Sequence, residues 1–465
     1  LWTDSRYWTQ AERQLDCNWE LQRTSQWGAV PVGGNISLDP FLFSIDTWNS
    51  YSQALHGSGR TLLPIENNLV DQVWGDQRPP PLSRPFAPLP GNSWQEKVAG
   101  IRQQMEQHVR RPTAVLLSGL EETAWLFNLR GHDIPYNPVF YSYTLLTNTS
   151  ISLFVDELRL SAAGVAGHAT PSLPLQEKLL EDSYSPVMLA KAVKNPKEQK
   201  LLRAAHVRDA VAVIQYLLWL EKMVPQGQVD EFLGAQHIDT LRQSVLFQSI
   251  SASGLNAALA HYSPSNGSSR KLSVDEMYLS DTGGQYLDGT TDITRTVHWG
   301  VPTPLQKEAY TRVLMGNIDL SRLVFPPNTA GGLESFARRA LWDVGLNYGH
   351  GTGHGIGNFL SVHEWPVGFQ SNNVPLAAGM FTSIEPGYYC DGEFGIRIED
   401  VALVVNAQTE VPFLTFEVVS LVPYDRNLIN LSLLSPEQVL GARGREAEQG
   451  CGVRGERRRG LGGWM

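Results

Sequence analysis

Two Asp-Gly dipeptides, Asp288-Gly289 and Asp391-Gly392, each stand between short runs of apolar or alternating residues. Asp-Gly is a typical centre of a tight hairpin turn, because both residues tolerate the positive φ angles that such a turn needs. The flanking runs therefore predict antiparallel strands within residues 245–425. The preceding residues 200–224 carry apolar side chains at helical spacing, with charges between them. We expect an antiparallel sheet covered by helices in this part of the chain.

The proline-rich stretch RPPPLSRPFAPLPG, residues 78–91, divides the chain. Proline fits neither a helix interior nor a strand ladder, so this stretch predicts an extended linker. Before it, residues 1–85 begin as extended structure and pass into a helical pattern with Trp8, Ala11 and Leu15 on one face. We expect a first α/β domain here, with its beginning missing.

Residues 92–189 predict a second α/β domain. A helix is expected from about Trp94, and the runs TAVLLSG, TAWLFNLRG, PVFYSYTLL and SISLFV are interpreted as strands. Residues 160–174 then turn to Ala, Gly, Ser and Pro where a complete α/β domain would supply further strands, so the domain is expected to be shortened. A third domain is predicted over residues 190–440, followed by a disordered Gly/Arg-rich tail, residues 441–465.

Composition excludes several classes of protein. The formal net charge of −10 argues against nucleic acid as a partner. No apolar stretch approaches the about 20 residues that cross a bilayer, and residues 1–15 lack the apolar core of a signal peptide. Three cysteines are too few for a disulfide framework. Four glycosylation sequons would suit a secreted glycoprotein, although a chain of this length collects roughly two or three by chance: Asn35, Asn148, Asn266 and Asn430.

Three segments of the third domain carry residues suited to chemistry. The first, MYLSDTGGQYLDGTTDITRTVHW, places Asp281 and Asp292 on two strands joined by a glycine-rich reversal, so both carboxylates can face one site. An edge or turn role is the more common one for a single Asp on a strand. This hairpin alone therefore gives only weak support for a metal site.

The second segment is GHGTGHGIGNFLSVHEW, which contains His350, His354 and His363. Its alternating glycines disfavour a helix, because each interior Gly costs roughly 1 kcal/mol relative to Ala. We expect these histidines on loop and strand, where glycine lets the backbone approach a ligand closely. The spacing does not match the G-x-G-x-x-G of a dinucleotide site.

The third segment, GMFTSIEPGYYCDGEFGIRIEDVALVV, predicts a strand, an Asp-Gly turn and a second strand, with Glu385 on the first and Glu399 on the second. Arg397 and Glu399 alternate with two isoleucines, so the charged pair shares one face. A salt-bridged surface hairpin is the alternative if the segment is taken alone.

Together the three segments supply four carboxylates and one imidazole. Such oxygen-rich donors favour a hard divalent ion such as Mn²⁺ over structural zinc. Two such ions about 4 Å apart share a hydroxide and polarise a carbonyl in known two-metal sites. The expected cofactors are two divalent ions, Mn²⁺ first, with Zn²⁺ or Co²⁺ as alternatives.

These motifs resemble the aminopeptidase P branch of the pita-bread metallopeptidases, in D-TGG-Y-DGTTDITRT, HGTGHGIG-F--VHE-P and EPGYY-DGEFGIRIEDV. The likeness extends to TDSRYW, WLFNLRGHDIPYNPVF and AKAVKN in the earlier domains. It implies two creatinase-like, ribonuclease H-like α/β domains, both incomplete here, before a pita-bread catalytic domain. The segments ISASGLNAALAHYSP and VHEWPVGFQSNN look most like the membrane-bound form of this branch.

The resemblance also implies roles for individual residues. Asp281, Asp292 and Glu399 would hold one ion, and Asp292, His354, Glu385 and Glu399 the other. Glu385 would take the proton of the attacking water, His363 would stabilise the oxyanion, and His261 and His350 would contact the substrate. Arg397 would orient a carboxylate. For Tyr388 and Asp4, which are weaker candidates, a packing role is an equal alternative.

The implied activity is hydrolysis of the N-terminal Xaa-Pro bond of peptides by a metal-bound hydroxide. A prolidase-like dipeptidase and a non-catalytic pita-bread module that binds peptides or proteins are the alternatives. By the same resemblance we expect a homodimer on the extracellular side of the plasma membrane, held by a glycosylphosphatidylinositol lipid anchor. The chain shows neither a signal peptide nor the hydrophobic tail that directs such an anchor, and it leaves the family pattern after SPEQ. A fragment or a splice product is the hypothesis for that ending.

Overall fold

The structure is a computed structural model that describes residues 2–23, 36–40, 42, 45–57, 59–65, 67–75, 91–155, 184–242, 244–369 and 374–441. The chain divides into two compact units. One comprises Leu1–Ser5 and Leu15–Leu82, and the other comprises Arg6–Gln14 and Ser83–Met465. Most of the predicted linker, the stretch 160–174 and the predicted tail from residue 442 onward lie outside the described residues.

The first unit contains two small parallel ladders. One pairs β1 (Trp2–Thr3) with β2 (Gln22–Arg23), and the other pairs β3 (Ile36–Leu38) with β4 (Leu62–Pro64). Its helices are α2 (Ile45–Leu55) and α3 (Leu69–Trp74). Helix α1 (Trp8–Gln14) groups with the second unit, and Ala11 is buried on its predicted apolar face.

The first part of the second unit, residues 91–155, is an antiparallel sheet with helices. Its helix α4 (Trp94–Gln107) begins at a capping box, in which Ser93 and Glu96 bond each other's backbone N–H groups. The sheet has the order β5-β6-β7. Its elements are β5 (Ala114–Leu117), α5 (Leu120–Leu126), β6 (Tyr143–Thr147) and β7 (Ile151–Phe154).

One strand prediction in this part is wrong. The beginning of TAWLFNLRG belongs to helix α5, and the rest of the run is turn and loop. All residues from 122 to 126 are buried, so the helix shows no polar face and its apolar run carries no helical period. The strands predicted in TAVLLSG, PVFYSYTLL and SISLFV are confirmed as β5, β6 and β7.

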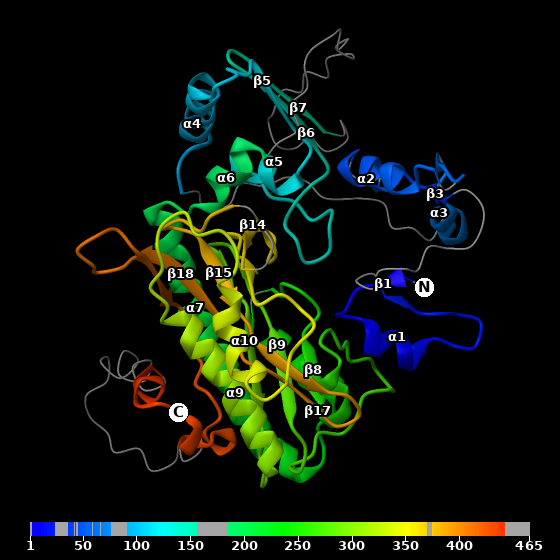
Figure 1. The fold of residues 1–465 in the computed structure, drawn as a ribbon, viewed down its shortest axis with the longest axis vertical. Helices are drawn as coiled ribbons and strands as arrows, with labels where there is room; N and C mark the ends of the chain where they lie inside the picture. Colours follow the sequence, from blue (N-terminus) through cyan, green and yellow to red (C-terminus); the bar gives the residue numbers. More distant parts are fainter. Residues whose placement is uncertain are drawn as a thin grey trace. The chain divides into compact units, whose positions relative to one another are not determined.

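The remainder of the second unit, residues 184–441, surrounds the three chemical segments. The long helix predicted near residues 200–224 is confirmed as α7, which starts at a capping box of Asn195 and Glu198 with Pro196 in its first turn. The other helices pack around strands, and α9 and α10 lie side by side (Figure 1). The helices are α6 (Pro186–Ala192), α7 (Pro196–Met223), α8 (Glu231–Thr240), α9 (Pro304–Ser321) and α10 (Glu334–Trp342), with 3-10 turns η3 (Val224–Gln226), η4 (Gly254–Ala258), η5 (Arg426–Leu428) and η6 (Leu431–Leu433).

The predicted antiparallel strands form two main sheets and two hairpins. The sheets have the orders β12-β9-β8 and β14-β13-β15-β18-β19, and the hairpins are β10-β11 and β16-β17. Both predicted hairpins are confirmed, with Asp391-Gly392 in the turn from β16 to β17. At the other hairpin the two turn residues are Leu287 and Asp288, and Gly289 opens β11. The strands are β8 (Ile250–Ser253), β9 (Tyr278–Thr282), β10 (Gln285–Tyr286), β11 (Gly289–Thr290), β12 (Ile293–Val297), β13 (His354–Gly355), β14 (Glu364–Gly368), β15 (Phe381–Ile384), β16 (Gly387–Cys390), β17 (Phe394–Arg397), β18 (Asp400–Asn406) and β19 (Leu414–Val418).

The apolar core explains how charged side chains come to face inward. Ile396 and Ile398 are completely buried against Tyr310 and Val313 of α9. Because side chains alternate along extended backbone, Arg397 and Glu399 point to the opposite face, as the alternation predicts. Among the described residues, no helix is long and apolar enough to cross a membrane.

Candidate metal centre

The five predicted ligands lie at the ends and edges of neighbouring strands. Asp281 lies in β9, and Asp292 immediately precedes β12, which pairs with β9. Glu385 follows β15 and Glu399 precedes β18, which is paired with β15. His354 opens β13, the strand on the other side of β15.

The third segment differs from the two continuous strands that its sequence predicts. Its first strand is interrupted at residues 385–386 and its second at 398–399, so β16-β17 forms a hairpin separate from the sheet of β15 and β18. Pro386 has no N–H group to donate to a ladder, which explains a break at this point. The break places both glutamates at the junction between hairpin and sheet.

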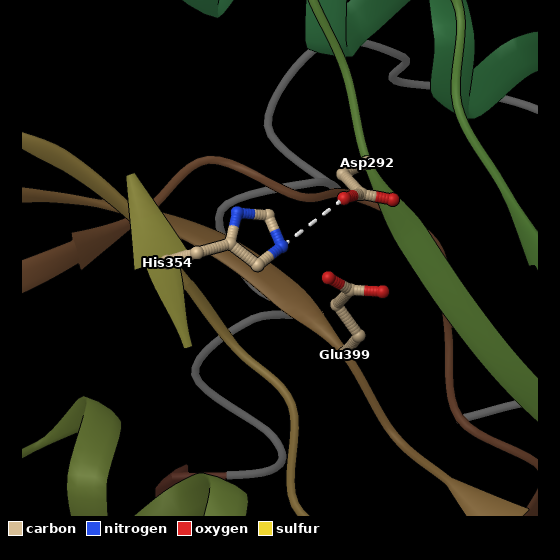
Figure 2. Close-up of side chains that lie close together, drawn as sticks. All are labelled: Asp292, His354 and Glu399. Carbon is tan, nitrogen blue, oxygen red and sulfur yellow. Dashed lines mark ion pairs between the residues drawn. The ribbon is translucent and has the colours of Figure 1, made fainter. Parts of the chain in front are cut away.

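Three of the five side chains converge closely. One ligand atom each from Asp292, His354 and Glu399 lies within 4.8 Å of the other two, and Figure 2 shows the three side chains directed at a common point. His354 Nε2 is 3.6 Å from Asp292 Oδ2 and 3.3 Å from Glu385 Oε1, which brings a fourth ligand to the same imidazole. The arrangement holds donors from four strand ends around one small volume.

Hydrogen bonds set the orientation of the imidazole and of the glutamates. His354 Nδ1 is 3.0 Å and 3.1 Å from the carbonyl oxygens of Gly355 and Val362, which can only accept. Nδ1 therefore carries the proton, and Nε2 keeps a lone pair for a metal. Ser383 Oγ donates to Glu385 Oε1 at 3.1 Å, and Thr294 Oγ1 donates to Glu399 Oε2 at 2.7 Å.

The carboxylates have more acceptor oxygens than the surrounding protein satisfies. Among the described residues, buried Asp281 Oδ1, Asp292 Oδ1 and Glu399 Oε1 have no hydrogen-bond partner. Burial and the neighbouring carboxylates raise the pKa of Asp292 and Glu399, and burial raises the pKa of Glu385 to about 7. Bound cations would favour the ionised forms and take up the free oxygens. The residues therefore fit divalent metal ions.

Arg397 is the principal positive side chain in contact with this cluster. Its Nη2 lies 2.5 Å from Asp281 Oδ2, its Nε donates to Thr294 Oγ1 at 3.2 Å, and its Nη1 donates to Tyr389 OH at 2.6 Å. The guanidinium thus binds Oδ2 of Asp281 and leaves Oδ1 without a hydrogen-bond partner among the described residues. The contact agrees with the orienting role expected for Arg397.

Two of the three outer histidines contact the cluster or its supports, and the third, His261, contacts Tyr7. The His363 ring packs edge-on against His354, with centroids 4.3 Å apart. His350 Nε2 is 2.8 Å from Tyr389 OH, and His261 Nδ1 is 2.9 Å from Tyr7 OH.

All three outer histidines are neutral near pH 7. The positive charge that His354 can carry, together with burial, lowers the pKa of His363 to about 3. Burial and Arg397 lower the pKa of His350 to about 3 and that of His261 to about 4. Each ring can therefore donate one hydrogen bond and accept one.

Four supporting residues were not predicted from the sequence. Thr294 and Ser383 lie two positions from Asp292 and Glu385, so strand alternation could have indicated them. Tyr389, not the weaker candidate Tyr388, meets Arg397 and His350, while Tyr388 packs against the apolar core. Tyr7 carries no local signal, because its partner His261 is 254 residues away.

Two family models match parts of the chain. Residues 200–406 match the model of metallopeptidase family M24, and residues 77–173 match the creatinase/prolidase N-terminal domain. Fold and site together define a metallopeptidase of the M24 class, in which a pita-bread catalytic domain follows a creatinase-type domain in the sequence.

The relatives narrow the class. Xaa-Pro aminopeptidase 2 of Rattus norvegicus is 61% identical, over 94% of this chain and 74% of the relative. The structure of an X-prolyl aminopeptidase from Caenorhabditis elegans has a TM-score of 0.88 and 33% sequence identity to this chain. The match covers 96% of this chain and 84% of the Caenorhabditis elegans chain, which is described as a cytosolic enzyme with a di-nuclear active site. A prolidase from Pyrococcus horikoshii shares the fold, with a TM-score of 0.55 and 24% sequence identity. The match covers 71% of this chain and 99% of the prolidase chain. The chain belongs to the Xaa-Pro aminopeptidase family.

Proposed function

We propose that this chain is a metal-dependent aminopeptidase that removes the first residue from peptides with proline in second position. The observation that carries the proposal is the cluster of buried carboxylates around His354, with three oxygens that no described residue satisfies. Membership in the Xaa-Pro aminopeptidase family supports the substrate class.

Two divalent cations, when bound, would lower the pKa of the attacking water and polarise the scissile carbonyl. We assign one ion to Asp281, Asp292 and Glu399, and the other to Asp292, His354, Glu385 and Glu399. The oxygen-rich donor set favours Mn²⁺.

Glu385 is the proposed general base. It takes a proton from the attacking water and returns it to the prolyl nitrogen as the peptide bond breaks. Its Oε1 already accepts a hydrogen bond from Ser383 Oγ, which orients the carboxylate. Proline supplies no N–H at the scissile bond, so the enzyme must hold the substrate through its carbonyls and its free ammonium.

The histidines are proposed to hold those carbonyls. A neutral His363 would stabilise the tetrahedral oxyanion as an N–H donor, and His261 and His350 would contact the peptide near the scissile bond.

Two alternatives differ in substrate or in chemistry. A prolidase would cleave Xaa-Pro dipeptides and leave Xaa-Pro-Pro peptides intact. A non-catalytic module would bind peptides without turnover, and the presence of all five proposed ligand residues in the sequence argues against it. The Caenorhabditis elegans aminopeptidase covers 96% of the chain and the prolidase 71%, which favours the aminopeptidase.

The proposed setting is extracellular, on the plasma membrane through a lipid anchor, as a homodimer. It rests on the resemblance to Xaa-Pro aminopeptidase 2. Asn148 and Asn266 are exposed, as glycosylation requires, whereas Asn35 lies outside the described residues. Glycosidase treatment of protein from mammalian cells would test the glycan sites, and sedimentation would test the dimer.

The activity is tested with an Xaa-Pro-Pro tripeptide and the matching Xaa-Pro dipeptide. Chelation should abolish release of the first residue from the tripeptide, and Mn²⁺ should restore it. Cleavage of the dipeptide alone would favour the prolidase, and tripeptide binding without turnover in metal-loaded protein would favour the binding module.

A further inference from the structure

A short segment near the start of the chain reaches the catalytic domain. Residues Arg6–Gln14 group with the compact unit that contains the metal centre, not with the rest of the N-terminal region. Within this segment Tyr7 places its hydroxyl 2.9 Å from Nδ1 of His261, and the two rings meet edge to face at 5.2 Å and 66°. The segment therefore supplies a hydrogen-bonding partner to a residue of the proposed substrate site.

Helix α1, which follows Tyr7, is attached to two elements of the catalytic domain. The Arg13 guanidinium forms an ion pair with Asp391 in the turn of the β16-β17 hairpin, and its Nη1 donates to the carbonyl oxygen of Leu255 at 3.4 Å. Leu255 lies in η4, just before His261 in sequence, and Ala11 of α1 is buried. These contacts attach α1, and with it the preceding Tyr7, to the catalytic domain.

The chemistry of the two groups fixes the direction of their hydrogen bond. A neutral imidazole has one N–H and one lone pair. A phenol is a stronger hydrogen-bond donor than an imidazole N–H, and an imidazole nitrogen is a stronger acceptor than a phenol oxygen. The favoured arrangement has Tyr7 O–H donating to Nδ1 of His261, and the ring proton then resides on Nε2.

We infer that Tyr7 is a positioning residue that holds His261 in the Nε2–H tautomer, as a hydrogen-bond donor to a carbonyl oxygen of the peptide substrate. The identity of the acceptor rests on the proposed function, whereas the tautomer does not. The same tautomer logic applies to His354, whose Nδ1 proton is held by backbone carbonyls, leaving Nε2 as the acceptor. Opposite partners at Nδ1 thus leave a lone pair on Nε2 of His354, suited to a metal, and an N–H on Nε2 of His261, suited to a hydrogen-bond acceptor.

Nitrogen NMR of histidine-labelled, Zn²⁺-loaded protein reads the tautomer without any turnover. We expect His261, assigned with the His261→Gln variant, to show a protonated Nε2 and a hydrogen-bonded, unprotonated Nδ1, and Tyr7→Phe to shift the Nδ1 resonance. A protonated Nδ1 in the unmodified protein, or an Nδ1 resonance that Tyr7→Phe leaves in place, would overturn the inference. Either result would stand even if the protein had no peptidase activity.

Kinetics with an Xaa-Pro-Pro peptide test the consequence for the reaction. Loss of one neutral hydrogen bond in Tyr7→Phe should lower kcat/KM about 3- to 10-fold, and the loss should vanish when the same change is made in a His261→Ala background. Tyr143→Phe, an exposed tyrosine of β6, is the matched control and should be unchanged. Equal losses from Tyr7→Phe in both backgrounds would show that Tyr7 acts independently of His261 and would overturn the inference.

Discussion

Two buried charged clusters in the catalytic domain differ in how their carboxylate oxygens are paired. Glu364, next to His363, is 1% exposed, and each of its oxygens meets a lysine: Oε1 lies 2.8 Å from Lys191 Nζ, and Oε2 contacts Lys194 Nζ. At the metal centre four carboxylates share Arg397, and three of their oxygens have no partner among the described residues.

The difference separates a structural cluster from one built to hold a ligand. Buried carboxylates that are fully paired need nothing further, and they connect elements such as α6 and β14. Buried carboxylates in excess are costly unless a cation joins them. Unpaired carboxylate oxygens, and not burial alone, therefore distinguish the candidate metal site from the ion-paired one.

The largest expected effect comes from changing Glu385, the proposed general base. Glu385→Gln keeps the size and one oxygen of the side chain but cannot accept the proton, so kcat should fall about 10²- to 10⁴-fold. Steady-state kinetics on an Xaa-Pro-Pro peptide measure the loss, and metal analysis with circular dichroism checks that ions and fold remain. Full activity would refute the role assigned to Glu385.

Changing Glu364, which is paired with two lysines, should lower the stability of the protein. Glu364→Gln leaves two buried lysines without their carboxylate, which should cost about 3–5 kcal/mol of the free energy of unfolding. Urea denaturation of the metal-free protein measures it. A cost below about 1 kcal/mol, the scale of exposed pairs, would mean that the lysines are satisfied elsewhere and would weaken the comparison.

The excess charge at the metal centre should make stability depend on pH. The folded pKa of Glu385, about 7, exceeds its ordinary value of 4.5. Its protonation therefore favours the folded state, and this contribution is present at low pH and lost as the pH rises toward 7. The free energy of unfolding of each protein is measured in the presence of a chelator. Between pH 4.5 and pH 8 the value for the unmodified protein should fall by about 2–3 kcal/mol relative to that of Glu385→Gln. A constant difference between the two proteins would exclude a raised pKa.

The smallest effect is expected for an exposed ion pair, which serves as a reference for the cost of breaking a buried one. Arg203 bonds Glu417 through two contacts of 2.7 Å, but the side chains are 38% and 42% exposed. Glu417→Gln should change the free energy of unfolding by about 0–1 kcal/mol, and less in high salt. A loss as large as that of Glu364→Gln would mean that pairing, rather than burial, sets the cost.

Local patterns were sufficient for most strands and for the orientation of β17. Alternation predicted that Arg397 and Glu399 would share a face opposite the isoleucines, and the core confirms it. The patterns failed where burial removed the contrast on which they depend, as in helix α5. They also missed the interruption of the strands at Glu385 and Glu399, which places both glutamates beside the sheet.

The sequence by itself determined the donor types, the strands and turns that bear them, and the family. Those features depend on neighbours a few residues away, whose alternation and turn chemistry act locally. Only the tertiary structure decided which polar groups meet: Lys191 with Glu364, Tyr7 with His261, and Tyr389 rather than Tyr388 with Arg397. Such pairs join residues from separate elements, so their energies arise only when distant strands and helices pack and exclude water.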